Sequence, residues 1–134
     1  MAGAPIEYSE TVLEHFRKPR NAGVFPTGTP DVIEGSAGNR RQGREISLAL
    51  RLEAGRVVEC RYRAYGCPAT IALCSVMSER LKGRILQECR QMSGIALAEE
   101  LELPPAKRAA ALLLEDALEA AFARYNMTSK LQPA

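Results

Sequence analysis

Two runs of alternating apolar and polar residues, joined by a short turn, constrain the fold of this chain more than any other feature. The apolar positions are Ile46, Leu48, Leu50 and Leu52 in the first run and Val58, Cys60, Tyr62 and Ala64 in the second. Alternation with a period of two places such residues on one face of an extended strand. The intervening Glu53-Ala54-Gly55 is typical of a turn. The sequence therefore predicts an antiparallel hairpin with one buried face.

Three helices are predicted around this hairpin. The first runs from a cap at Ser9 to Arg17, and its apolar stripe comprises Val12, Leu13 and Phe16. The second spans 68–82, begins at a proline and is apolar nearly all round, which indicates packing on several sides. The third spans 105–125, and its apolar face comprises Ala110, Leu114, Ala117, Leu118, Ala121, Phe122 and Tyr125.

The remaining segments complete an α+β fold class, with a small antiparallel sheet of about three strands packed against helices. Short helical turns are expected at 85–91 and 95–101, and 21–43 is expected to be a loop with a short strand at 32–34. With 134 residues, 46% of them hydrophobic, the chain fits one domain. We expect that domain to span 1–134, with flexible ends at about 1–6 and 127–134.

The charge and hydropathy of the chain argue against nucleic-acid and membrane partners. Eighteen Lys and Arg against sixteen Asp and Glu give a net charge of +2, which by itself indicates neither a nucleic-acid nor a membrane partner. The absence of Trp also argues against binding of single-stranded nucleic acid. No apolar run approaches the roughly 18 residues that span a bilayer, and no signal-peptide pattern opens the chain. We therefore expect a cytoplasmic protein.

Cys67 is the best candidate for a reactive residue. It stands between Gly66 and Pro68, at the start of the predicted second helix. Unpaired backbone N–H groups and the positive end of the helix dipole favour a thiolate there, so its pKa should lie below that of a free thiol. Taken alone, the residue types leave open whether Cys67 reacts or only packs.

The other titratable candidates favour packing. Cys60 belongs to the buried face of the hairpin, Cys74 lies inside the apolar helix, and Cys89 lies in a short helical segment. No Cys-x-x-Cys pair is present, so a zinc ribbon or a thioredoxin-type site is not expected. His15 is the only histidine, and a lone histidine makes neither a metal site nor a catalytic dyad. We therefore predict that the protein is not an enzyme.

The loop and hairpin are locally basic. Between residues 39 and 63 there are seven arginines, namely Arg40, Arg41, Arg44, Arg51, Arg56, Arg61 and Arg63. Three glutamates occupy the same stretch. This region could bind an anion or an acidic partner, or it could simply be a solvated face of the sheet.

Several short motifs occur along the chain in a characteristic order. They are Tyr8-Ser9-Glu10 with His15 and Pro19-Arg20-Asn21, Tyr65-Gly66-Cys67, Lys82-Gly83, the stretch from Ala98 to Pro105 with Lys107, and Glu115-Asp116-Ala117. Together they resemble the motifs of the iron–sulfur cluster assembly scaffold proteins, of the IscU type and the NifU N-terminal domain. The similarity covers roughly residues 7–126 and implies the α+β fold of that family.

The resemblance also implies a ligand set, and this chain departs from it. The family holds its nascent cluster with three cysteines, aided by an Asp and a His. At four of those five positions this chain has Gln42, Arg44, Ala109 and Ala110, and only Cys67 retains a ligand side chain. Iron in such clusters prefers thiolates, and Arg44 places a cation where the family has an anion. We therefore expect an iron–sulfur cluster only transiently, or shared between chains.

A second family motif is nearly intact. The chaperone-recognition motif is present as Leu103, Pro104, Pro105, Ala106 and Lys107. Two prolines make a stiff segment suited to a groove, although the same prolines could merely start the last helix. The resemblance implies two partners, a cysteine desulfurase and an Hsp70-type chaperone.

Two functions remain open at this point. In the first, the protein is a divergent scaffold that handles sulfur, or supplies one iron ligand, through Cys67. In the second, it is a non-catalytic pseudo-scaffold that binds assembly partners in a regulatory or adaptor role. The sequence does not decide between them, and it does not determine the oligomeric state.

Overall fold

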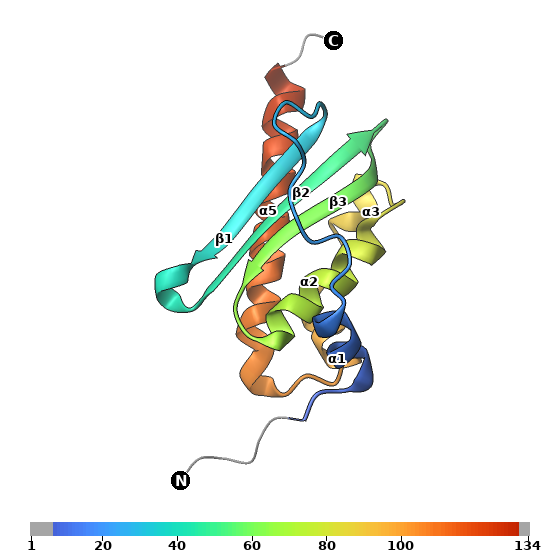
Figure 1. The fold of residues 1–134 in the computed structure, drawn as a ribbon. Helices are drawn as coiled ribbons and strands as arrows, with labels where there is room; N and C mark the ends of the chain where they lie inside the picture. Colours follow the sequence, from blue (N-terminus) through green and yellow to red (C-terminus); the bar gives the residue numbers. More distant parts are fainter. Residues whose placement is uncertain (1–6, 132–134) are drawn as a thin grey trace.

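A computed structural model describes residues 7–131 and shows a three-stranded antiparallel sheet with helices (Figure 1). The strands are β1 (Val32–Asn39), β2 (Arg44–Glu53) and β3 (Arg56–Tyr65), in the order β1-β2-β3. The helices are α1 (Glu10–Arg17), α2 (Pro68–Leu81), α3 (Leu86–Cys89), α4 (Gly94–Glu100) and α5 (Arg108–Leu131), with short 3-10 turns η1 (Arg40–Gln42) and η2 (Pro105–Lys107). The predicted α+β class is confirmed.

The helices cover one face of the sheet and one end of the molecule. α5 packs along β1 and β2, while α2 packs on β3 and carries α1 on its other side (Figure 1). The predicted apolar residues of β2 are buried between the sheet and the helices, namely Ile46, Leu48, Leu50 and Leu52. Ten residues of α2 are buried, as expected for a helix that packs on several sides.

The register of the hairpin differs from the predicted one at one point. Leu50 lies opposite Cys60, but Leu52 lies opposite Val57, because the pairing shifts between Arg51 and Leu52. A β-bulge of this kind adds one residue to a strand and reverses the alternation beyond it. Val57 is therefore fully buried and Val58 only half-buried. The assignment of Val58 to the buried face was wrong.

β1 is longer than the short strand predicted at 32–34, since it pairs with β2 over its whole length. Its glycines and small residues are unusual in strands, which is why the pattern indicated a loop. The position of Gly35 explains why β1 contains a glycine. A Cβ on Gly35 would lie 2.4 Å from the Ala117 carbonyl oxygen and 2.2 Å from the Ala121 nitrogen. Glycine therefore lets α5 cross β1 at close range.

The first helix presents a different face from the one predicted. Val12 is buried as expected, but Phe16 is 39% exposed and His15 is buried in its place. The His15 Nδ1 lies 2.7 Å from the Ser75 hydroxyl of α2. Burial lowers the pKa of His15, and the positive charge of Arg20 lowers it further. Because Ser75 offers a hydrogen bond inside the interface, the imidazole is accommodated there in its neutral form.

The two ends of the chain lie mostly outside the described residues. Residues 1–6, which the sequence predicted to be flexible, are not described, and neither are residues 132–134. α5 continues to Leu131, beyond the predicted end at Tyr125. Within the described range, no helix is both long and apolar enough to cross a membrane.

Candidate functional site

Cys67 lies where β3 turns into α2, as the sequence predicted. It is the N-cap residue of α2, in an extended conformation, and Pro68 is the first helical residue. Gly66 before it has φ +156°, and a Cβ there would lie 2.8 Å from the Thr70 hydroxyl oxygen. A glycine is therefore needed to bring the chain close to Thr70. The turn leaves the Cys67 side chain half-buried rather than enclosed.

The surroundings of Cys67 favour its thiolate. Partial burial alone would raise its pKa, but the Thr70 hydroxyl and the nearby backbone N–H groups of Thr70 and Ala69 outweigh this effect. The positive charge of Lys107 acts in the same direction, and the pKa of Cys67 falls to about 7. The Sγ–Oγ1 distance to Thr70 is 3.5 Å. Cys67 is therefore a substantial fraction thiolate at neutral pH.

The other three cysteines have the opposite character. Cys60, Cys74 and Cys89 are buried, and burial raises the pKa of all three. The pKa of Cys60 rises to about 12. Such thiols stay protonated at neutral pH and behave as small apolar groups. The prediction that these three cysteines pack in the core is confirmed.

The family ligand positions converge on the end of the sheet that holds Cys67. Glu45 pairs with Tyr65 across β2 and β3, so Arg44 stands beside the Gly66–Cys67 turn. The charge of Lys107 reaches Cys67, so the start of α5 lies at the same end. Figure 1 shows the β1–β2 loop, the start of α2 and the start of α5 at that end of the sheet.

The side chains at those positions offer few ligands. Gln42 is exposed in the η1 turn, Arg44 is half-buried, Ala109 is exposed and Ala110 is buried. Among residues 7–131, no three His, Cys, Asp or Glu side chains are grouped closely enough to hold a metal ion. One low-pKa thiol beside a cation can attack an electrophilic sulfur or donate a single bond to iron.

The predicted chaperone-recognition residues form the entry to α5. Leu103, Pro104 and Lys107 are half-buried, whereas Pro105 and Ala106 are exposed. Pro105 opens the η2 turn, and the Lys107 N–H donates to the Pro104 carbonyl over 2.8 Å. The two prolines therefore begin the η2 turn that leads into α5, which itself starts at Arg108 rather than at the predicted residue 105. Two residues of the motif, Pro105 and Ala106, are exposed to a partner.

Sequence reasoning missed Thr70 and Lys107 as partners of Cys67. Thr70 follows the N-cap cysteine by three residues, the spacing at which side chains and N–H groups meet around a helix start. That spacing could have identified Thr70. Lys107 is distant in sequence and becomes a neighbour of Cys67 only through the packing of α5.

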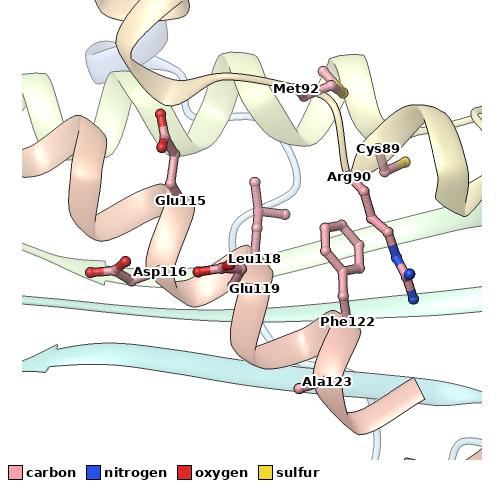
Figure 2. Close-up of a pocket in the computed structure, with 9 residues that line it drawn as sticks. All are labelled: Cys89, Arg90, Met92, Glu115, Asp116, Leu118, Glu119, Phe122 and Ala123. Atoms are coloured by element: carbon pink, nitrogen blue, oxygen red, sulfur yellow. The ribbon is translucent and has the colours of Figure 1, made fainter. Parts of the chain in front are cut away.

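A separate hollow of about 490 Å³ lies between the α3–α4 region and α5 (Figure 2). Arg90 lies over the ring of Phe122, at 5.8 Å from its centroid. Glu115 accepts a hydrogen bond from the Ile95 N–H over 3.0 Å and so caps the start of α4. Because Cys67 is not among its lining residues, this hollow does not belong to the candidate site.

The fold is that of a small α+β domain with a cysteine at the β3–α2 turn, and comparison with known proteins specifies its family. The chain belongs to the family of NifU-like N-terminal domains, whose model matches residues 7–132. It is 38% identical over 122 residues to the iron–sulfur cluster assembly scaffold protein IscU of Escherichia coli, covering 90% of this chain and 95% of that protein. It is 36% identical over 120 residues to iron–sulfur cluster assembly protein 2 of Arabidopsis thaliana, covering 89% and 74% respectively.

Solved structures agree on the fold. A scaffold protein assigned to the SUF system of Fervidobacterium islandicum superposes with a TM-score of 0.66 at 21% identity, covering 85% of this chain and 95% of that one. A NifU-like N-terminal protein from Brucella abortus superposes with a TM-score of 0.65 at 16% identity, covering 92% of this chain and 95% of that one. The expected IscU/NifU-like architecture is thereby confirmed.

Proposed function

We propose that this protein acts in iron–sulfur cluster assembly as a divergent scaffold that handles sulfur through Cys67 and does not hold a full cluster within one chain. One observation supports this most strongly. Cys67 alone among the four cysteines combines partial exposure with a lowered pKa. A thiolate of this kind accepts sulfur from a persulfide, whereas a buried protonated thiol does not.

The transfer step needs no further oxidant. The Cys67 thiolate attacks the terminal sulfur of a donor persulfide, a new S–S bond forms on Cys67, and the S–S bond of the donor breaks. The donor leaves as a thiolate, so electrons balance. The Thr70 hydroxyl, 3.5 Å from Sγ, and the backbone N–H groups at the helix start stabilise the thiolate before the attack.

Coordination chemistry limits what the site can retain as cargo. Iron in clusters is held by thiolates, while glutamine binds iron poorly and alanine cannot bind it. Lys107 adds positive charge near Cys67, which disfavours a nearby iron cation. An iron–sulfur cluster would therefore rest on Cys67 only transiently, or with ligands shared between chains.

The relatives suggest the partners. A cysteine desulfurase would supply the persulfide, and an Hsp70-type chaperone would bind the segment from Leu103 to Lys107, in which Pro105 and Ala106 are exposed. We place this activity in the cytoplasm. These assignments follow from kinship with IscU proteins rather than from a contact in the structure.

A second function follows if Cys67 proves unreactive. The protein would then be a non-catalytic pseudo-scaffold that binds the same partners in an adaptor or regulatory role. The observation that favours this alternative is the replacement of the ligand side chains by Gln42, Arg44, Ala109 and Ala110, while the exposed part of the chaperone-recognition segment persists.

Reconstitution with iron, sulfide and reductant tests the proposal. We expect little or no cluster per monomer. A stable, stoichiometric cluster with the visible absorption of Fe–S charge transfer would contradict it. A Cys67→Ser variant treated in parallel separates weak binding through Cys67 from binding elsewhere, because residual absorption that depends on Cys67 identifies it as the single ligand.

A further inference from the structure

The basic loop and hairpin divide into two groups of arginines. Away from the Cys67 turn, Arg51 and Arg61 of the hairpin are paired with carboxylates, and Arg56 donates to the Gly83 carbonyl. Arg51 contacts Glu53 at 3.1 Å and Glu59 at 2.7 Å, and Arg61 contacts Glu59 at 3.2 Å. Carboxylates of the same strands neutralise these two arginines, so this part of the hairpin is a solvated face with little excess charge.

At the end that holds Cys67 the arginines have no such partners. Among the residues that the structure describes, Arg40, Arg41, Arg44 and Arg63 form no ion pair with a carboxylate. Arg40 lies over the ring of Tyr65, 5.2 Å from its centroid. Glu45 is adjacent in sequence and pairs with none of them. Positive charge therefore accumulates at this end of the sheet.

Two of these arginines line a shallow groove, which we call the arginine groove. Its walls include Arg40 and Arg63, and its apolar lining comprises Pro19, Ala22, Ala64 and Ile71. Its volume is about 380 Å³. Ile71 follows Cys67 by one helical turn, so the groove lies alongside the cysteine turn.

We propose that the arginine groove docks an acidic segment of a partner protein, in which carboxylates flank a small aliphatic side chain. Cationic walls around an apolar floor complement that pattern in charge and in polarity. A segment seated there lies within one helical turn of Cys67. The proposal deepens the proposed function, since it gives the chemistry of the surface through which a partner approaches Cys67, and it does not require that Cys67 accept sulfur.

Nucleic acid is the less suitable ligand for this surface. Single-stranded nucleic acid needs free aromatic rings on which bases stack. Tyr65 is already covered by Arg40, and Phe25 lies under Arg61 at 5.4 Å. Tyr62, the aromatic residue that lines the groove, is buried and offers no exposed ring on which a base could stack, so a peptide with carboxylates fits the groove better.

A binding measurement with defined peptides tests this proposal. The probe is a short fluorescent peptide with Asp and Glu around a central Leu, and the matched peptide has Asn and Gln instead. Anisotropy titrations use the whole protein, the Arg40→Gln/Arg63→Gln variant and the control Arg56→Gln/Arg84→Gln. The control removes the same charge from exposed positions at the other end of the hairpin. Circular dichroism checks that both variants fold.

We expect the acidic peptide to bind and its amide counterpart not to bind. The Arg40→Gln/Arg63→Gln variant should bind about tenfold more weakly, and the control within about twofold of the unchanged protein. High salt should weaken binding. The proposal is overturned by equal losses in the two variants, by no binding of the acidic peptide, or by tighter binding of a single-stranded oligonucleotide of equal charge. No sulfur donor is present, so failure of the chemistry at Cys67 leaves this result unchanged.

Discussion

Cys67 lies at the start of α2 and Cys74 lies two helical turns further along the same helix. The structure shifts the pKa values of their thiols in opposite directions. Cys67 caps the start of α2, where N–H groups, Thr70 and Lys107 lower its pKa to about 7. Cys74 is fully buried, and burial raises its pKa. The difference shows that position on a helix, rather than residue type, decides which cysteine of this chain ionises near neutral pH.

The largest expected effect comes from restoring the ligands that Cys67 lacks. We predict that the variant Gln42→Cys, Arg44→Asp, Ala109→His and Ala110→Cys converts a protein with almost no cluster into one with near-stoichiometric cluster, because thiolates then surround Cys67. Visible absorption and iron content after reconstitution measure this. The same variant with Cys67→Ser is the control. If the restored variant stays colourless although circular dichroism shows it folded, the assignment of these positions is wrong.

Alkylation compares the two cysteines of α2 directly. At pH 7 the Cys67 thiol should react at least about a hundredfold faster than Cys74, because far more of it is thiolate. The lowered pKa fixes the pH dependence, so the thiolate and the reaction are lost as pH falls through about 7. Limited iodoacetamide labelling followed by mass spectrometry measures both rates. Equal protection of the two thiols would show that Cys67 only packs.

The comparison also shows which parts of the molecule the sequence could predict. Residues from Ile46 to Leu52 alternate strictly, and the α2 segment is apolar nearly all round, so both elements form as predicted. Cys67 could be placed at a helix start because glycine and proline flank it. The bulge at Val57 and Val58, by contrast, leaves no signal in a pattern of apolar residues.

Other features depend on partners distant in sequence. β1 contains glycine because α5 crosses it at Gly35, and the local pattern there indicates a loop. His15 replaces Phe16 in the core because Ser75 offers a hydrogen bond. Lys107 reaches Cys67 only after α5 has packed. Tertiary contacts of this kind override local preference and cannot be read from neighbouring residues.

Thr70 offers a sharper test of why Cys67 differs from Cys74. Replacing Thr70 with Val removes the hydroxyl beside Sγ and keeps the shape of the side chain, so the pKa of Cys67 should rise by about one unit. Labelling at pH 6 to 7 should slow by up to about tenfold. Thr70→Ser retains a hydroxyl and should behave almost like the unchanged protein. If Val and Ser give the same rate, the hydroxyl does not stabilise the thiolate.

Lys107 should have the smallest effect. Its charge is the weakest of the influences that lower the pKa of Cys67, so Lys107→Gln should raise that pKa slightly and slow labelling about twofold at low salt. High salt should abolish the difference, because it screens the charge. Lys82→Gln, at the far end of α2, is the matched control. A loss that persists in high salt would indicate a structural change instead of a charge effect.

Sulfur loading of the unmodified protein tests the central claim most directly. The protein is incubated with a low-molecular-weight persulfide donor at neutral pH, and the intact chain and its peptides are weighed by mass spectrometry. We predict the added mass of one sulfur atom on Cys67, none on Cys60, Cys74 or Cys89, and its removal by a thiol reductant. An unmodified Cys67 under conditions that load a free thiol, or sulfur on the buried cysteines instead, would contradict the account.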